Sequence, residues 1–253
     1  RLVRFGSRAV HADLRSHNVD IKIETNGEMI DQAVAERLAG LSLRSVQISM
    51  DGATAKSHEA LRENGDWLRV VDTCRLLSKI NVNMEIVFVP TSFNIHEVAQ
   101  TVDLAAKLGA YGFYSGKLMR IGRASTNWKR LCPSDAQYRQ FFETMASKTE
   151  QYRGVMKVYC YPYDVIEELR YRMTSPSASL LVLPNGKVKL IGPLPFICGN
   201  LKTMPLEDVW SQYKLAWGRP EVQDFARRIL NEPALVAEAN NWIELYECGS
   251  AGV

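Results

Sequence analysis

Two short polar motifs, each directly after an apolar stretch, carry side chains that can bind a ligand. They are Thr-Asn-Gly at residues 25–27 and Ser-Met-Asp-Gly at residues 49–52. Asn26 and Ser49 can donate and accept hydrogen bonds, and the Asp51 carboxylate can accept them from hydroxyl or ammonium groups. Asn-Gly and Asp-Gly are also ordinary turn formers, so a purely structural role stays open for each motif alone. Their occurrence at two matching strand ends favours a ligand-binding rim.

The elements that must position these motifs are two strands joined by a helix. The stretches before the motifs contain β-branched and long apolar residues, which are typical of strands buried on both faces. Residues 31–39 predict the helix, and Gly40 ends it. This order predicts a parallel βαβ unit with both motifs at the carboxyl ends of its strands. The apolar residues that support the strands are Ile21, Ile23, Val46, Ile48 and Met50.

The same alternation continues as far as residue 118. Apolar strand-like stretches and amphipathic helices follow one another at intervals of about 25 to 35 residues. Regular alternation of this kind is typical of a parallel barrel or an open parallel sheet, so the fold class is predicted to be α/β. The further helices are expected at residues 55–62, 67–80 and 95–108, and the further strands at residues 82–90 and 111–118.

The pattern changes in the second half of the chain. Pro-Asn-Gly at residues 184–186 lies between two apolar stretches, which is a strong signal for a β-hairpin. We place a domain boundary near residue 153, so that residues 1–153 form the parallel α/β domain and residues 154–253 a small α+β domain. Other expected elements are a helix at 133–152, a strand at 155–161, and helices at 206–216 and 220–230.

The composition excludes several classes of protein. The chain has 253 residues, 46% hydrophobic and 23% charged, which is ordinary for a globular protein with a sizeable core. The net charge of +3 comes from interleaved bases and acids, which does not indicate a nucleic-acid partner. Neither a membrane span nor a signal peptide is recognisable, so no membrane association is expected. The five cysteines are isolated from one another, which fits a reducing compartment and predicts a cytoplasmic location.

The order and spacing of several motifs resemble the radical S-adenosylmethionine (radical SAM) family, in the branch with a C-terminal SPASM or twitch domain that modifies peptides and proteins. The motifs at 25–27 and 49–52 are followed, as in that branch, by His58 and Arg62. The resemblance implies a partial (β/α)6 TIM-like barrel at residues 1–153 and a degenerate, small SPASM/twitch-like domain at residues 154–253. It continues through Gly122-Arg123-Ala124 and, more weakly, through residues 183–187 and 198–201.

The resemblance also implies cofactors and partners. Members of the family bind a [4Fe-4S] cluster through the cysteines of a CxxxCxxC loop, and the cluster binds S-adenosylmethionine, which yields a 5′-deoxyadenosyl radical. The sequence contains no such loop and opens with Arg1. We therefore expect the ligand cysteines upstream of Arg1 in a longer protein, and this chain alone to be inactive. The expected partners are a precursor peptide or protein substrate and an electron donor such as flavodoxin or ferredoxin.

Five residues correspond by position to cofactor contacts in the family. The resemblance implies that Ser49 and Asp51 contact the ribose or the methionine end. It also implies that Asn26 lines the rim and that Leu118 offers backbone groups to adenine. The family places an asparagine near Asn94 that reaches the adenosyl group, although a cap by Asn94 or Ser92 at the start of the next helix explains this segment without any function.

Four more residues are candidate contacts to the cofactor or the substrate. Thr25 belongs to the first motif, and His58 and Arg62 are placed to orient Asp51 or a substrate. An ion pair that fixes a helix to a loop is the alternative for the latter two. Arg123 can hold a carboxylate of the cofactor or substrate, or it can be an ordinary exposed loop arginine.

The cysteine pattern of the second half departs from the family. Leu190 and Ile191 stand where cysteines of an auxiliary cluster are expected, and iron–sulfur binding needs several soft ligands. We therefore predict no auxiliary cluster. Cys160, Cys198 and Cys248 are kept as candidate hydrogen-atom donors or ligands.

Three functions remain to be compared. The first is a radical SAM enzyme that modifies a peptide or protein after translation. The second is a clusterless barrel that acts as a peptide-binding scaffold or partner. The third is an ordinary TIM-barrel aldolase or isomerase with Asp51 and His58 as acid and base. It requires eight repeats and a late phosphate-binding glycine loop, and neither is visible.

Overall fold

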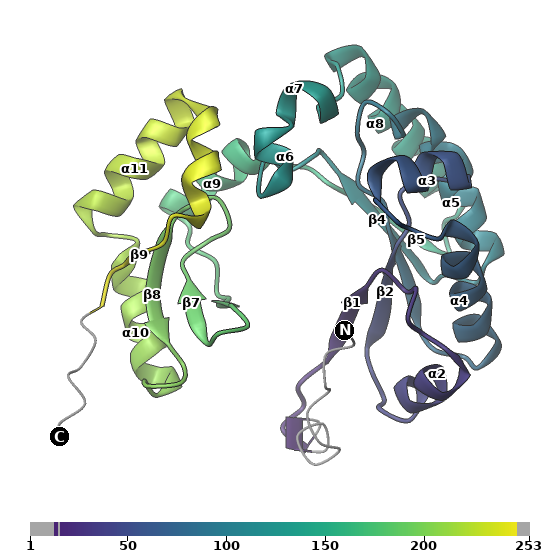
Figure 1. The fold of residues 1–253 in the computed structure, drawn as a ribbon, viewed down its shortest axis with the longest axis horizontal. Helices are drawn as coiled ribbons and strands as arrows, with labels where there is room; N and C mark the ends of the chain where they lie inside the picture. The colour runs from purple at the N-terminus through teal and green to yellow at the C-terminus, as the bar shows by residue number, and fades with distance from the viewer. Residues whose placement is uncertain (1–12, 15, 247–253) are drawn as a thin grey trace. The chain divides into compact units, whose positions relative to one another are not determined.

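The computed structural model describes residues 13–14 and 16–246, and the chain divides into two compact units (Figure 1). Unit 1 consists of Arg1–Leu118 and Cys132–Pro162, and unit 2 of Met119–Leu131 and Tyr163–Val253. The two units are described separately below.

Unit 1 is built on a parallel sheet of five strands in the order β1-β2-β3-β4-β5. Each strand except the last is followed by a helix before the chain returns to the sheet, as the βα alternation predicts. The predicted α/β class is thus confirmed. The strands are β1 (Lys22–Thr25), β2 (Ser45–Ser49), β3 (Met84–Val87), β4 (Gly112–Gly116) and β5 (Lys157–Tyr161).

Four helices of unit 1 begin at side-chain caps. The side chains of Asp31, Thr54, Asp66 and Ser134 each accept a hydrogen bond from a backbone N–H in the first turn of a helix. The helices are α2 (Gln32–Ala39), α3 (Ala55–Leu61), α4 (Trp67–Lys79), α5 (Val98–Lys107) and α8 (Asp135–Gln151), with a short 3₁₀ helix, η1 (Ile95–Glu97), before α5.

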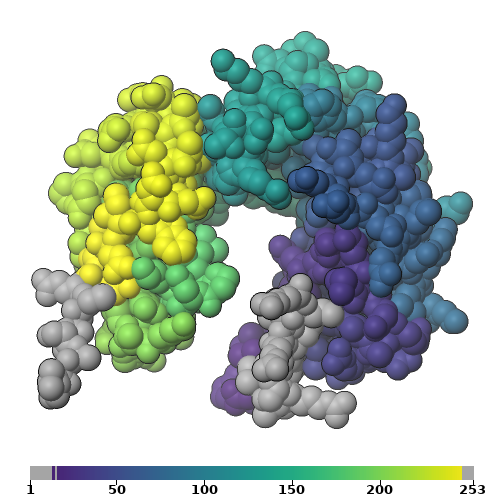
Figure 2. Space-filling view, viewed as in Figure 1, coloured from purple at the N-terminus to yellow at the C-terminus, as the bar shows by residue number. Residues whose placement is uncertain are grey.

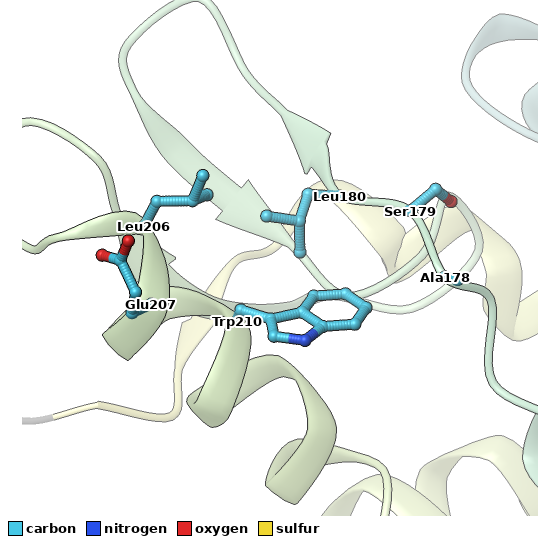
Figure 3. Close-up of a pocket in the computed structure, with 6 residues that line it drawn as sticks. All are labelled: Ala178, Ser179, Leu180, Leu206, Glu207 and Trp210. Atoms are coloured by element: carbon cyan, nitrogen blue, oxygen red, sulfur yellow. The ribbon is translucent and has the colours of Figure 1, made fainter. Parts of the chain in front are cut away.

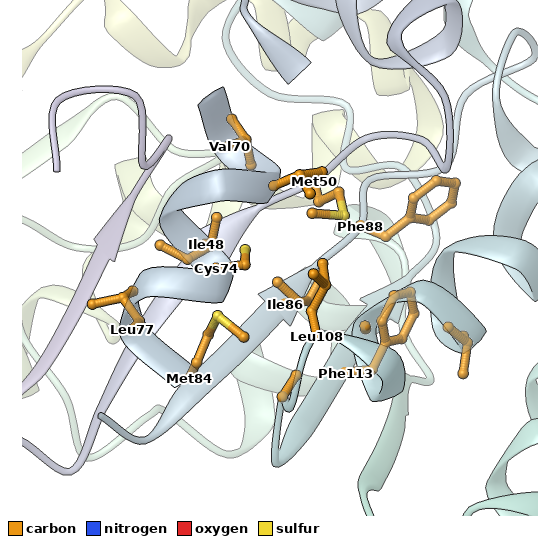
Figure 4. Close-up of a cluster of buried hydrophobic side chains, with 14 of the residues drawn as sticks. Ile48, Met50, Val70, Cys74, Leu77, Met84, Ile86, Phe88, Leu108 and Phe113 are labelled. Atoms are coloured by element: carbon orange, nitrogen blue, oxygen red, sulfur yellow. The ribbon is translucent and has the colours of Figure 1, made fainter. Parts of the chain in front are cut away.

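The core of unit 1 lies between one face of the sheet and these helices. Alternate residues of the strands, such as Ile48 and Ile86, point toward the helices and are fully buried. Cys74 and Leu77 of α4 pack against them (Figure 4). Burial raises the pKa of the Cys74 thiol to about 12, so it is a neutral apolar group of the core.

The other residues of the strands form a second face of the sheet, which we call the polar face. It carries Gln47 and Ser49 of β2, Glu85 of β3, Tyr114 of β4, and Lys157 and Tyr159 of β5. The apolar residues of β1 and β2 predict strands that are buried among apolar groups on both faces. The polar face departs from this prediction. Only one of the two faces is apolar.

The buried carboxylate of Glu85 organises part of the polar face. Glu85 has a side chain that is 2% exposed, and it lies 2.6 Å from Lys22 Nζ and 3.1 Å from Gln47 Nε2. The Tyr111 hydroxyl also donates to it. Burial opposes ionisation of Glu85, but the hydrogen bonds from Lys22 and Tyr111 outweigh it and lower its pKa.

The parallel sheet extends beyond residue 153, where the sequence analysis places the domain boundary. β5 pairs with β4 in parallel, with Phe113 opposite Val158 and Gly116 opposite Tyr161. This pairing joins β5 to unit 1. In addition, Met119–Leu131 belongs to unit 2 although it precedes α8 in the chain.

Unit 2 contains a four-stranded sheet in the order β6-β7-β8-β9. The predicted hairpin joins the first two strands: Gly186 has a positive φ of 88°, and the Leu183 N–H donates to the Lys187 carbonyl at 2.8 Å. The strands are β6 (Leu181–Val182), β7 (Lys187–Lys189), β8 (Phe196–Asn200) and β9 (Ile243–Glu244). The helical elements are α6 (Arg123–Thr126), α7 (Trp128–Leu131), α9 (Val165–Thr174), α10 (Leu206–Ala216), α11 (Pro220–Asn231) and η2 (Pro233–Asn240).

The core of unit 2 includes the segment where the resemblance predicts cysteines of an auxiliary cluster. Leu190 is buried among Phe196 and Val209, and Ile191 packs against the same cluster. The neighbouring Lys189 is also buried, and its ammonium group donates to the carbonyls of Gly192 at 2.9 Å and Ala239 at 2.7 Å. Burial lowers the pKa of Lys189. Apolar packing and a lysine bridge between backbone segments therefore hold this region together.

We predict that Glu85→Gln destabilises the protein by about 2 kcal/mol, because it removes a buried charge from its hydrogen-bond donors. Glu143→Gln, at an exposed position on α8, is the control and should change the free energy of unfolding by less than about 0.5 kcal/mol. Denaturant unfolding of both variants measures the difference. Equal stabilities would show that the Glu85 network contributes nothing to the fold.

Candidate functional site

The Thr25–Gly27 turn ends β1 and is fixed by its own backbone geometry. Gly27 has a φ of +82°, and a Cβ there would lie 3.3 Å from Ile48 Cγ2, so glycine is favoured. The Gly27 N–H donates to Thr25 Oγ1 at 3.1 Å, and the Gly27 carbonyl accepts from Thr73 Oγ1 of α4 at 2.9 Å. Thr25 and Gly27 therefore shape the turn that carries Asn26.

Asn26 and Ser49 lie next to each other at the carboxyl ends of β1 and β2. The register places Thr25 opposite Ile48, so the next residue of each strand is also a neighbour. The Asn26 side chain is exposed and that of Ser49 is half-buried. Within the described part of the chain, neither has a side-chain hydrogen bond. These two polar groups are available to a ligand.

Asp51 is buried in the turn that follows β2, and its carboxylate is occupied by protein donors. Arg62 Nε donates to Oδ2 at 2.8 Å, and the Val89 N–H donates to Oδ1 at 3.2 Å. The Asp51 side chain is only 6% exposed. In this arrangement Asp51 joins the turn after β2 to α3 and to the segment after β3.

His58 of α3 fixes the backbone of the same turn. Its Nδ1 accepts the Asp51 N–H at 3.1 Å, which places the ring proton on Nε2. The ring is fully buried, and Nε2 has no partner among the described residues. Burial lowers the pKa of His58, and the opposing effect of the Asp51 charge is smaller. His58 is therefore a neutral acceptor at neutral pH.

Asn94 holds the turn from the opposite side. Its Nδ2 donates to the Asp51 carbonyl at 2.9 Å and to the Val89 carbonyl at 3.0 Å, and its Oδ1 accepts from the Thr91 N–H at 2.6 Å. Asn94 is fully buried and makes no side-chain cap of η1. Its contact with a cofactor stays a prediction, and its observed partners belong to the protein.

Two further residues hold the turn and are missed by the sequence analysis. Glu97 accepts from the Ala53 N–H at 2.9 Å and from the Ser57 hydroxyl at the start of α3, where a negative charge is favourable. Trp67 Nε1 donates to the Gly52 carbonyl at 3.2 Å. No motif identifies either residue, because each acts through its position beside a turn that is distant in sequence.

The other two predicted contacts lie farther along the chain. Leu118 is buried, and its N–H donates to the Tyr138 hydroxyl at 3.0 Å. Arg123 is exposed at the first residue of α6, which belongs to unit 2, and follows Gly122 with its φ of +53°. The roles of Leu118 and Arg123 toward a ligand stay predictions.

Two of the candidate cysteines, Cys160 and Cys198, are neutral thiols. Burial raises the pKa of Cys160 and of Cys198 to about 11. Cys160 lies in β5 of unit 1 and Cys198 in β8 of unit 2, where its thiol donates to the Val188 carbonyl at 3.4 Å. Cys248 lies outside the described residues. Within residues 13–14 and 16–246, no cluster of three or more His, Cys, Asp or Glu side chains suits a metal ion.

Unit 2 has a surface pocket of about 400 Å³ that is mainly apolar (Figure 3). The Trp210 ring of α10 and Leu180, just before β6, face each other across it, with Leu206 and Glu207 at its edge. None of the predicted site residues lines this pocket. In the described part of the chain, no helix is long and apolar enough to cross a membrane.

Comparison with known sequences identifies a matching family and several relatives. Residues 3–105 match the Radical SAM superfamily. The mycofactocin maturase MftC of Mycobacterium tuberculosis is 33% identical over 137 residues, which cover 54% of this chain and 35% of that protein. The sporulation killing factor maturation protein SkfB of Bacillus subtilis is 31% identical over 113 residues, covering 44% of this chain and 27% of SkfB. The chain spans about a third of the length of the MftC proteins that it matches.

Comparison with solved structures supports the fold. Streptococcus suis SuiB bound to S-adenosylmethionine superposes with a TM-score of 0.63 and 13% identity, over 88% of this chain and 53% of SuiB. The structure of SuiB bound to the precursor peptide SuiA gives a TM-score of 0.61. The sequence match, the parallel sheet and the position of the two turns agree with the resemblance predicted from the motifs. Residues 3–105 of the chain therefore belong to the radical SAM superfamily.

Proposed function

We propose that the protein containing this chain is a radical SAM enzyme that modifies a ribosomally made peptide or a protein. The observation that carries the proposal is the pair of available polar side chains, Asn26 and Ser49, at neighbouring strand ends of a radical SAM sheet. Two relatives named as maturation proteins support a peptide or protein substrate. Unit 2, with its hairpin and apolar core, is proposed to be a degenerate SPASM/twitch-like domain.

The residues present fit S-adenosylmethionine at the rim of β1 and β2. Asn26 and Ser49 would hydrogen-bond its hydroxyl and amino groups, and the carbonyl of Leu118 would be offered to the adenine. Bound at a reduced [4Fe-4S] cluster, S-adenosylmethionine supplies a 5′-deoxyadenosyl radical that takes a hydrogen atom from the substrate. The described residues provide no ligand set for that cluster.

Asp51, His58 and Arg62 are proposed to act as positioning residues. The Asp51 carboxylate already has two donors and is buried, so it acts by holding the turn beside Ser49 rather than by binding a ligand. His58 holds the Asp51 amide. Arg62 presents only its Nε to Asp51. Together these contacts keep the Ser49 hydroxyl at a fixed point on the rim.

The electron donor and the location are part of the same proposal. A reduced flavodoxin or ferredoxin would supply the electron that the cluster chemistry requires. A reducing cytoplasm fits the described cysteines, none of which forms a disulfide.

The reaction is tested with the full-length protein purified without oxygen. We expect it to bind iron and to convert S-adenosylmethionine to 5′-deoxyadenosine once it is reduced. Failure of both with an intact cluster loop would overturn the proposal and favour a peptide-binding scaffold.

We predict that Ser49→Ala and Asn26→Ala each weaken binding of S-adenosylmethionine by about fivefold, because each removes one hydrogen bond worth about 1 kcal/mol. Calorimetric titration of the iron-loaded protein measures this without catalysis. Ser147→Ala, on the exposed surface of α8, should leave the affinity unchanged. If all three variants bind equally well, the rim is not the cofactor site.

We predict that His58→Asn flattens the pH dependence of stability. The folded protein holds His58 neutral, with a pKa below 6.5, whereas the unfolded chain takes up a proton as the pH falls through 6.5. The free energy of unfolding therefore declines with falling pH, by at most about 1.4 kcal/mol per pH unit for one proton. Asparagine keeps an acceptor for the Asp51 amide but does not titrate in this range.

Denaturant unfolding at about pH 7.5 and about pH 5.5 measures this effect. The difference in stability between the two values should be smaller in His58→Asn than in the unchanged protein. His96→Asn, at an exposed position, should retain the full difference. If both variants behave alike, His58 is not held neutral by the fold.

A further inference from the structure

The polar face of the unit 1 sheet continues the row of residues that begins at the rim. Ser49 of β2 lies opposite Val87, Val87 lies opposite Tyr114, and Tyr114 lies opposite Tyr159. Since neighbouring strands are about 4.8 Å apart, Tyr114 is about 10 Å from Ser49 along this row. A group bound over the tyrosines would therefore lie beside a ligand bound at Ser49.

The two tyrosine rings form an aromatic surface on this face. Their centroids are 5.8 Å apart and the ring planes are inclined by 54°. A Cβ on Gly112 would lie 2.9 Å from Tyr114 Cε2, so the absence of a side chain there leaves room for this ring. The Tyr159 side chain is 41% exposed. The surface is accessible from the polar face of unit 1.

Two lysines lie over the rings, but only one has its charge compensated. Lys22 Nζ is 5.0 Å from the Tyr114 centroid and is held by Glu85 at 2.6 Å. Lys157 Nζ is 5.8 Å from the centroids of both Tyr114 and Tyr159. Lys157 is exposed and forms no ion pair with any described residue. It is a cation held by aromatic faces and available to an anion.

We propose that Tyr114, Lys157 and Tyr159 form a subsite for a carboxylate-bearing side chain of the peptide substrate. The proposal rests on the proposed function and adds to it a substrate class: a peptide with a Glu or Asp close to the residue that is modified. A single uncompensated ammonium group matches a single carboxylate rather than a polyanion. The tyrosine rings bind the apolar part of the same segment.

The Glu85 network lies in the same row across the sheet as Lys157, because Glu85 is opposite Gly112 and Gly112 is opposite Lys157. Glu85, Lys22 and Tyr111 satisfy one another there, so an incoming anion finds no further available cation among them. The charge pattern thus directs a carboxylate to Lys157.

The test is a fluorescence-polarisation titration of the full-length protein without S-adenosylmethionine. The probes are two fluorescein-labelled peptides that consist of Gly and Ser residues on both sides of a central pair. The central pair is Tyr-Glu in one peptide and Tyr-Gln in the other. We expect the Glu peptide to bind about fivefold more tightly than the Gln peptide, as one partly screened ion pair allows. Lys157→Gln should abolish this preference, and Lys157→Arg should retain it.

Lys107→Gln on α5 is the matched control, since Lys107 is exposed on the helical side of unit 1, and it should leave the preference intact. Tyr159→Leu should weaken the binding of both peptides by a similar factor, because it removes the aromatic ring and not the charge of Lys157. Equal binding of the Glu and Gln peptides, or a preference that survives Lys157→Gln, would overturn the subsite.

The carboxylate subsite and the proposed enzyme activity can be tested separately. The titration contains no cofactor, so its outcome does not depend on radical chemistry. A Glu preference that requires Lys157, in a protein that neither binds iron nor cleaves S-adenosylmethionine, would leave a peptide-binding site without the enzyme. Cofactor cleavage without any Glu preference would leave the enzyme without this subsite.

Discussion

The structure depends on the different chemistry of the two faces of one parallel sheet. Residues such as Ile48 and Ile86 bury one face against the helices, and the residues between them, such as Gln47 and Glu85, turn polar groups to the other face. Burying the apolar face supplies the main driving force for folding. The polar face is then available for binding without loss of the core, and the rim residues continue it at the carboxyl ends of the strands.

Polar residues near the rim fall into two groups with different tasks. Asp51, His58 and Asn94 are buried and bonded to the protein, and they fix the backbone. Asn26 and Ser49 are placed by that backbone and have no side-chain partner among the described residues. A motif residue can therefore have a structural role in the turn. Asp51 is the clearest example, because its carboxylate has Arg62 Nε at 2.8 Å.

The sequence predicts the parallel sheet, the order of helices and strands, and the two turns at residues 25–27 and 49–52. These features follow from local apolar patterns and from turn chemistry. The assignment of β5 to the sheet does not, because its pairing with β4 depends on contacts across the long helix α8. The sequence does not predict the roles of Glu97 and Trp67 for the same reason. Their partners belong to a turn that is distant along the chain.

The turn after β2 is held on three sides by Arg62, His58 and Asn94. A molecule that reaches Ser49 therefore meets a loop whose conformational entropy has already been lost during folding. Association should then proceed without a slow loop-closure step, at a rate governed by encounter and orientation.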